Sequence, residues 1–137
     1  MKIVLDTNIL LQSIGYSSRY RPIWNAFLNE VFDLQITSSI LLEYEEQLEK
    51  RTSKLVAVNI IALIGEALNA HYIDVFYEWN AIVADPDDNK FFDAAVAANV
   101  DYLVTNDGHF NPAKRFTFPK VNIVSADEFL EILARLA

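Results

Sequence analysis

The sequence of 137 residues lacks cysteine altogether and contains only two histidines, His71 and His109. Without cysteine the chain can form neither a disulfide nor a thiolate metal site, and two histidines do not make a histidine-rich zinc site. Any metal ion bound to this chain is therefore expected to be held by oxygen atoms. The sequence also lacks an apolar run long enough to span a membrane and a signal-peptide pattern, so we expect a cytoplasmic protein without membrane contact.

Positive charge is scarce as well, because 11 Lys and Arg residues stand against 19 Asp and Glu residues and give a net charge of −8. A generic nucleic-acid binder would normally carry a basic face that neutralises phosphates. This objection weakens if several acids share one pocket, because bound divalent cations reverse the local field. Three small basic clusters could line a phosphate path or could be solvated surface charges: Arg19 with Arg21, Lys50 with Arg51 and Lys54, and Lys114 with Arg115 and Lys120.

The composition that remains is that of a globular protein, with 53% hydrophobic and 22% charged residues. A chain of this length buries about 70% of the surface that its unfolded form exposes, which is enough for one hydrophobic core. The sequence has no internal repeats and no linker-like segments. We therefore expect a single domain over residues 1–137.

Short apolar segments alternate along the chain with segments of helical periodicity, and this alternation predicts an α/β fold with a parallel sheet between helices. The predicted strands are 3–5, 34–37, 71–76, 102–105 and 121–124. The predicted helices are 9–14, 22–31, 38–51, 54–70, 87–99 and 126–136. Residues 77–84 and 106–120 are predicted to be connections.

The predicted helix 54–70 carries more apolar surface than a single core-facing stripe needs. Full burial inside the domain is our first expectation for it. The alternative is that part of this surface meets a second copy of the chain, which would make a homodimer, or a partner peptide.

The first acid of the chain stands directly after a buried strand. Ile3, Val4 and Leu5 form the continuous apolar run that is typical of a strand covered on both faces. Asp6 then lies at the carboxyl end of that strand, where open α/β sheets place their ligands. The alternative interpretation is that Asp6 caps the short helix that follows.

Three further acids lie after strands or near the starts of helices. Asp107 follows the strand 102–105 much as Asp6 follows the first, and neighbouring strands lie about 5 Å apart. Glu43 lies beside the apolar stripe of helix 38–51. Asp88 lies in the first turn of helix 87–99, where the helix dipole favours an acid with or without a function. Asp93, further along that helix, is the alternative to Asp88.

Four motifs together resemble the PIN-domain family of metal-dependent ribonucleases. They are DTN at 6–8, a glutamate one turn into a later helix, DPDDNKFFDAA at 85–95 and VTND at 104–107. The resemblance extends over nearly the whole chain and is closest to PIN-family toxins of bacterial toxin–antitoxin pairs. It implies a three-layer fold with a central parallel sheet of about five strands in the order 3-2-1-4-5, flanked by helices.

The same resemblance implies a set of site residues and partners. The implied ligands of one or two Mg²⁺ or Mn²⁺ ions are Asp6, Glu43, Asp88 and Asp107, and the implied supporting residues are Thr7, Asn8, Thr105 and Asn106. Carboxylate oxygens are the ligands that these ions prefer. The implied substrate is RNA and the implied partner is a small antitoxin protein. A PIN nuclease that processes RNA or acts on DNA, and a non-catalytic binding module on a PIN scaffold, remain as alternatives.

Overall fold

The computed structural model describes residues 1–136, and its elements alternate along the chain as the sequence predicts. The strands are β1 (Lys2–Leu5), β2 (Asp33–Ile36), β3 (Ala70–Tyr72), β4 (Tyr102–Val104) and β5 (Ile123–Val124). The α-helices are α1 (Thr7–Ser13), α2 (Arg21–Leu28), α3 (Ser38–Arg51), α4 (Lys54–Glu66), α5 (Asn89–Ala98) and α6 (Ala126–Leu136). The 3₁₀ segments are η1 (Pro86–Asp88) before α5 and η2 (Gly108–Arg115) after β4.

The five strands are parallel and form one sheet in the order β3-β2-β1-β4-β5, which confirms the predicted order. β1 lies at the centre because Ile3, Val4 and Leu5 are apolar and almost completely buried. The register pairs Leu5 with Val104, so β1 and β4 end side by side. The strand order reverses between these two strands, which is where open α/β sheets form ligand sites.

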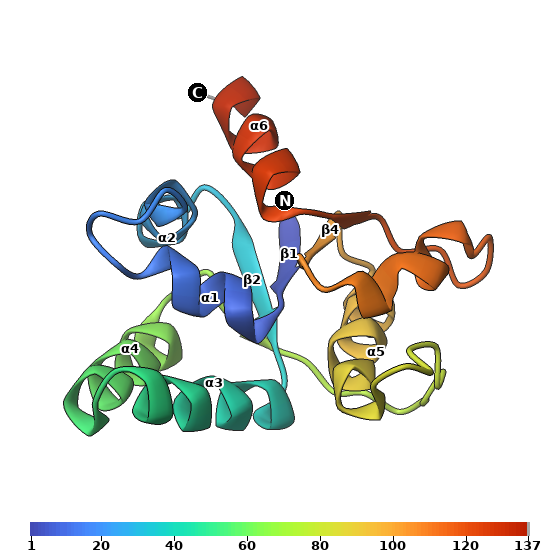
Figure 1. Ribbon diagram of the computed structural model, residues 1–137, viewed down its shortest axis with the longest axis horizontal. Coiled ribbons are helices and arrows are strands. Elements are labelled where there is room, and N and C mark those ends of the chain that lie inside the picture. The colour runs from blue at the N-terminus through green and yellow to red at the C-terminus, as the bar shows by residue number, and fades with distance from the viewer. Residues whose placement is uncertain (137) are drawn as a thin grey trace.

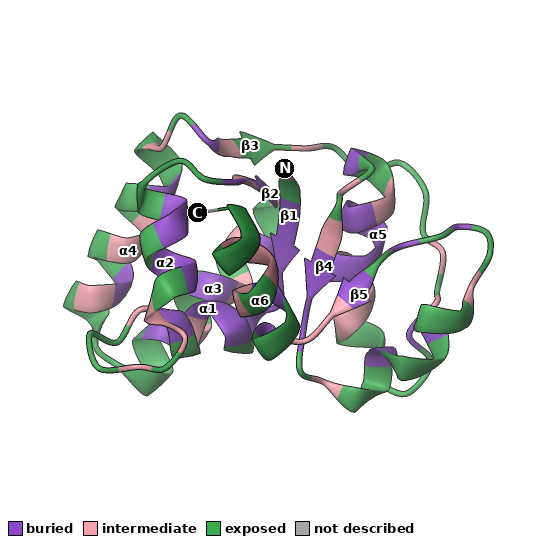
Figure 2. Ribbon diagram, turned by 90° about the horizontal axis from the view of Figure 1, so that it is seen from above, coloured by how far each residue is buried: buried purple, intermediate pink, exposed green. Residues whose placement is uncertain are grey.

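Helices cover both faces of the sheet and make the predicted three layers (Figure 1). α5 lies on one side and packs on β1, β2 and β4, whereas α1 to α4 lie on the other side and α6 packs on α2. The buried residues run along the strands other than β3 and along the inward faces of these helices (Figure 2). Trp24 and Phe27, which the sequence predicts for the core, are buried with their ring centroids 5.3 Å apart.

Several predicted boundaries are wrong. The helix predicted over 54–70 ends at Glu66, because Ala67 turns the backbone to an extended conformation and Asn69 folds inward. The chain then enters β3, which has three residues in place of the predicted 71–76. The predicted connection 106–120 contains η2, and the last strand is shorter than the predicted 121–124.

The predicted burial of helix 54–70 is also wrong. Only Ala57 and Ile64 of α4 are buried, whereas Leu55 and Val58 are 70% and 55% exposed. α4 packs along α3, and much of its remaining apolar surface faces outward. No helix within residues 1–136 is both long and apolar enough to cross a membrane. The domain core therefore leaves one apolar helix face uncovered.

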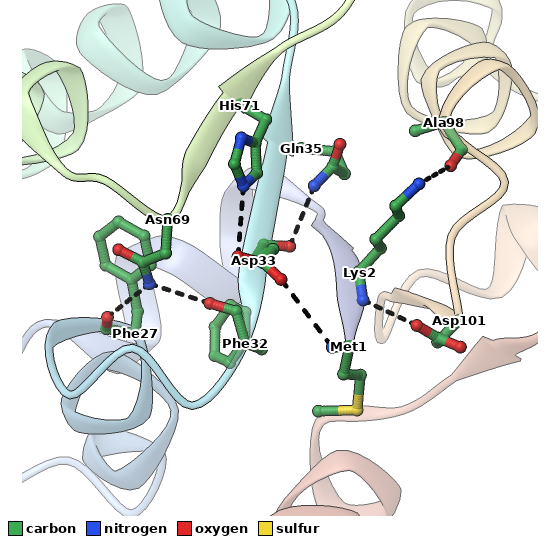
Figure 3. Close-up of polar contacts among 10 residues, drawn as sticks. All are labelled: Met1, Lys2, Phe27, Phe32, Asp33, Gln35, Asn69, His71, Ala98 and Asp101. Carbon is green, nitrogen blue, oxygen red and sulfur yellow. Dashed lines mark hydrogen bonds and ion pairs between the residues drawn. The ribbon is translucent and has the colours of Figure 1, made fainter.

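Polar contacts tie together the amino ends of the strands (Figure 3). The backbone amide of Lys2 donates to Asp101 Oδ2 at 2.7 Å, and His71 Nε2 lies 3.2 Å from Asp33 Oδ1. Asn69 is buried and donates from its amide nitrogen to two backbone carbonyls, each at 2.9 Å. Each acid drawn at this end of the sheet therefore has a partner.

Candidate metal centre

The carboxyl ends of β1 and β4 place Asp6 beside Thr105. The amide of Asp6 donates to the carbonyl of Val104 at 3.0 Å, and the Thr105 hydroxyl donates to Asp6 Oδ2 at 2.7 Å. The Asp6 side chain is 5% exposed and does not cap α1. The amides of Ile9 and Leu10 bond instead to the backbone carbonyl of Asp6. The helix-capping interpretation of this side chain is therefore wrong.

Glu43 reaches the same edge of the sheet from α3. The Thr37 hydroxyl accepts a hydrogen bond from the Ile40 amide, so α3 begins directly after β2 and carries Glu43 in its second turn. Glu43 Oε2 accepts a hydrogen bond from the Thr7 hydroxyl, and Glu43 Oε1 forms an ion pair with Lys90 Nζ at 2.8 Å. α1 and α5 together fix the orientation of this carboxylate.

Tyr44 holds the end of β1 in place. Its ring is fully buried, and its hydroxyl donates to the carbonyl of Leu5 at 2.5 Å. Burial raises the pKa of Tyr44 well above 10, and the charges of Asp6 and Glu43 act in the same direction. Sequence reasoning identified Tyr44 only as a core residue, because a helical pattern does not reveal what a buried hydroxyl touches.

Asp88 and Asp107 both lie against His109. Asp107 Oδ1 accepts the His109 amide at 2.9 Å and caps η2, and Asp85 caps η1 through the Asp87 amide at 3.1 Å. Asp88 makes no capping contact. His109 Nδ1 lies 3.3 Å from Asp107 Oδ1, 3.8 Å from Asp88 Oδ2 and 4.0 Å from Asp85 Oδ2. One imidazole thus lies against three carboxylates, two of which are predicted ligands.

Burial and mutual repulsion shift the pKa values of these acids. Burial raises the pKa of Asp6, and the charges of Asp107 and Glu43 raise it further. Burial also raises the pKa of Asp88 to about 7, and the charges of Asp6, Asp85 and Asp107 add to this. Asp6 is therefore close enough to interact with each of Glu43, Asp88 and Asp107, and we refer to these four residues as the acid cluster.

Three other predicted residues contact different parts of the molecule. Asp93 is buried, but its Oδ1 accepts the Trp79 amide at 3.0 Å, and its pKa is raised mainly by burial and not by the acid cluster. Asn106 Oδ1 accepts the amide of Ala126 at 2.9 Å and so supports the start of α6. The exposed side chain of Asn8 makes no hydrogen bond with any residue in 1–136. Asp88, and not Asp93, lies with the other acids.

The donor atoms here fit a divalent cation. Asp88 Oδ2 is buried and has no hydrogen-bond partner within the described part of the chain. Leaving a buried carboxylate oxygen unsatisfied is costly, and a cation would satisfy it. Ligand atoms of Asp85, Asp88 and His109 lie within 4.8 Å of one another. Carboxylates suit Mg²⁺ and Mn²⁺, and an imidazole suits transition metals.

Sequence reasoning assigned no role to Lys90 and Asp85, which neighbour the acid cluster, and placed His109 only as a loop residue near the rim of the pocket. The expectation that only oxygen could face a metal ion overlooks the imidazole. Each of the three lies within three residues of a predicted ligand, because Lys90 and Asp85 flank Asp88 and His109 follows Asp107. That proximity is the signal that could have identified them.

A family model described as the PIN domain matches residues 2–109. The chain belongs to the PIN domain family. The match spans all four residues of the acid cluster and includes His109. The resemblance drawn from the sequence motifs is thereby confirmed. Comparison with curated proteins gave no match.

Solved structures of VapC-type proteins have the same fold as this PIN domain. VapBC2 of Rickettsia felis, bound to a DNA fragment from its promoter, matches with a TM-score of 0.60 and 18% identity over 91% of this chain and 98% of that chain. VapC20 of Mycobacterium tuberculosis, described as a sarcin-ricin loop cleaving toxin, matches with a TM-score of 0.62 and 15% identity. The match covers 81% of this chain and 94% of that chain. DNA-bound VapBC of Salmonella typhimurium matches with a TM-score of 0.59 and 19% identity over 92% of this chain and 98% of that chain.

Proposed function

We propose that this PIN domain is a ribonuclease that depends on Mg²⁺ or Mn²⁺ and hydrolyses RNA phosphodiester bonds. The acid cluster would hold one or two of these ions. The observation that carries the proposal is the buried Asp88 oxygen without a partner in the described part of the chain. Burial, together with the charges of the neighbouring acids, raises the pKa of Asp88 to about 7. Such a group is costly in a folded protein unless cations join it. Binding of a cation would relieve that cost.

Residues around the acid cluster have separate tasks in the proposed site. Thr105 positions Asp6 through its hydroxyl, and Tyr44 fixes the backbone just before Asp6. Lys90 orients Glu43 through their ion pair. Because the Lys90 side chain is 25% exposed, its ammonium group is also accessible to an approaching phosphate. The divalent ion supplies neutralisation of phosphate charge and activation of water for in-line hydrolysis.

We further propose that the chain is the toxin of a type II toxin–antitoxin pair. The structural likeness to VapC20, which is described as a sarcin-ricin loop cleaving toxin, supports this role, as do the likenesses to the two VapBC structures. Co-expression with the product of the neighbouring reading frame provides the test. A small protein that co-purifies and blocks cleavage is expected, whereas its absence would favour a role in RNA processing.

The exposed apolar face of α4 supports a protein contact in this proposal. Leu55 and Val58 lie on it, and a second copy of the chain or a segment of the antitoxin would bury them. Light scattering at tens of micromolar protein distinguishes a homodimer from a monomer whose α4 face is free to bind an antitoxin.

Cleavage of a mixed RNA pool tests the enzymatic proposal directly. Purified protein is incubated with RNA, or with DNA of the same length, in millimolar Mg²⁺ or Mn²⁺ and in excess EDTA. We expect RNA cleavage with either ion and none in EDTA. Cleavage that persists in EDTA would contradict the metal-dependent mechanism, and preferential cleavage of DNA would support the DNA nuclease alternative.

A further inference from the structure

The segment 114–120, which begins in the last turn of η2, carries three exposed cations on a strongly acidic chain. Lys114, Arg115 and Lys120 form no ion pair within residues 1–136. Phe118, between them, is 83% exposed. Unpaired cations and an exposed ring therefore alternate on a segment that begins seven residues after Asp107.

Phe118 is the end of a row of three aromatic rings. The centroids of Tyr77 and Trp79 lie 4.6 Å apart, and those of Trp79 and Phe118 lie 5.7 Å apart with an edge-to-face angle of 81°. Tyr77 is 64% exposed at the other end of the row. Large apolar groups that gather in the open commonly mark a binding surface, and this row has free ring surface at both ends.

Both segments that carry the row are fixed to α5. The Trp79 amide donates to the buried Asp93 carboxylate at 3.0 Å, and the Phe116 ring packs edge-to-face on Phe92 at 6.0 Å. The two segments lie beside α5 at the same end of the molecule in both ribbon views (Figures 1 and 2). α5 begins directly after Asp88. The three rings are therefore held against α5, the helix that follows Asp88. Asp93 contributes by holding the backbone of Trp79.

We propose that the Tyr77–Trp79–Phe118 row and the cations of segment 114–120 bind a stretch of single-stranded RNA that extends away from the acid cluster. This inference rests on the proposed function. Aromatic side chains stack on unpaired bases, and lysine and arginine neutralise the phosphates between them. Bases inside a double helix offer no free face for stacking, so the surface selects single strands.

The surface also accounts for how a chain with net charge −8 holds a polyanion. Cations that are not engaged by carboxylates can each displace a counterion from a phosphate. Arg51 and Lys54 provide two similar charges at the corner between α3 and α4, but no row of stacked rings lies beside them. Those two residues therefore make a matched control for charge alone.

The test is RNA binding by the Asp6→Asn protein in millimolar Mn²⁺, measured as the fluorescence anisotropy of a labelled single strand. A strand of about 12 nucleotides lies within the usual site sizes of single-strand binders. Because one stacked base contributes about 1–3 kcal/mol, Phe118→Ala should raise Kd about tenfold, and Phe118→Trp should restore it. Changing the three cations to glutamine should reduce the slope of log K against log salt by about 2.

Two control variants separate this surface from exposed residues in general. Tyr16 is 92% exposed with the Arg21 guanidinium 4.3 Å over its ring, so Tyr16→Ala removes a similar ring elsewhere. The double change Arg51→Gln with Lys54→Gln removes remote charge. Neither control should change Kd more than twofold. Equal losses in controls and test variants, or equal affinity for double-stranded RNA, would overturn the inference.

The outcome for this surface is separable from the outcome for the enzyme. If wild-type protein cleaves RNA with metal but the Phe118→Ala variant binds RNA like its parent, the proposed function stands and the surface does not bind RNA. If wild-type protein cleaves nothing and the variants still lose affinity as expected, the surface stands and the ribonuclease proposal fails. A loss of oligomer mass in Phe118→Ala without loss of RNA affinity would assign the surface to a protein contact.

Discussion

The two ends of the parallel sheet differ in how they balance charge. At the amino end Asp101 accepts the Lys2 amide and Asp33 lies beside His71, so each acid has a donor or a basic group (Figure 3). At the carboxyl end the four residues of the acid cluster, together with Asp85, face only Lys90 and His109 among residues 1–136. Of the two ends of the sheet, the carboxyl end has more acids than basic groups to balance them.

The amino end of the sheet therefore stabilises the fold, whereas the carboxyl end destabilises it. Paired groups at the amino end hold the strands together. Burial raises the pKa of Asp88 at the carboxyl end, and the charges of the neighbouring acids raise it further. Strongly shifted pKa values that arise from burial and like charges tend to occur at functional sites. We therefore propose that the functional site lies at the carboxyl end of the sheet.

The largest expected effect is the loss of RNA cleavage when one acid of the cluster is neutralised. Asp6→Asn and Asp107→Asn should each lower the rate by about 100-fold or more, because even the outer partners of metal ligands commonly contribute 10–100-fold. Asp101→Asn, at the amino end, should stay within about twofold. Gel-based cleavage assays with Mn²⁺ measure all three, and similar losses at both ends would refute the distinction between them.

The pH dependence of stability without metal should depend on Asp88. Its pKa is about 7 in the folded protein against an ordinary value of 3.8, so the folded state holds a proton that the unfolded state has lost. Stability should therefore fall as pH rises from about 4 to 7, by roughly 2 kcal/mol over the upper two units. Asp88→Asn should flatten this dependence.

Urea unfolding in EDTA at several pH values measures this effect. Comparison of wild type with Asp88→Asn isolates the contribution of one group, because Asp6 and Asp93 also have raised pKa values in both proteins. Parallel pH profiles for the two proteins would show that burial and neighbouring charges do not raise the pKa of Asp88 in the folded protein.

A change at the amino end should affect stability alone. Asn69→Ala removes a buried donor from the carbonyls of Phe27 and Phe32, of which the Phe27 carbonyl keeps the Glu30 amide, and should destabilise the domain by about 2 kcal/mol. RNA cleavage per folded molecule should stay unchanged. Thermal melts and cleavage rates on the same preparation provide the measurement, and a cleavage defect beyond the unfolded fraction would couple the two ends.

The smallest expected effect concerns the ion pair of Lys90 with Glu43. Lys90→Gln should cost about 1 kcal/mol in EDTA, because Glu43 is largely buried and loses its counter-ion, and less than this in Mn²⁺. Lys50→Gln breaks the exposed pair with Glu46 and should cost less than about 0.5 kcal/mol in both conditions. Equal costs with and without Mn²⁺ would argue that the ion does not adjoin Glu43.

The alternation of apolar segments was enough to predict the sheet and its flanking helices, because the central strands β1 and β4 are mostly buried and read as continuous apolar runs. The family motifs added the strand order. The burial of α4 could not be predicted, because an apolar helix has the same sequence whether its partner lies in the domain or outside it. The shortened β3 depends on the inward turn of Asn69, which is a tertiary contact.

The site could be predicted only as far as sequence motifs reach. Asp6 and Asp107 follow neighbouring strands, so their proximity follows from topology. The choice of Asp88 over Asp93 depends on the short η1 turn, which directs one acid toward the cluster and leaves the other to bind the Trp79 amide. Sequence reasoning also had no access to the contacts of His109, because those depend on how η2 folds back.

Calorimetric titration of metal-free protein with Mn²⁺ tests the central claim most directly, since that claim is that the acids at the carboxyl end form one cation site. We expect saturable binding of one or two ions to the wild-type protein and to Asp101→Asn. Asp88→Asn should bind at least about tenfold more weakly, on the scale that applies to residues around a metal. Absence of binding to the wild type, or equal affinity in Asp88→Asn, would contradict the account.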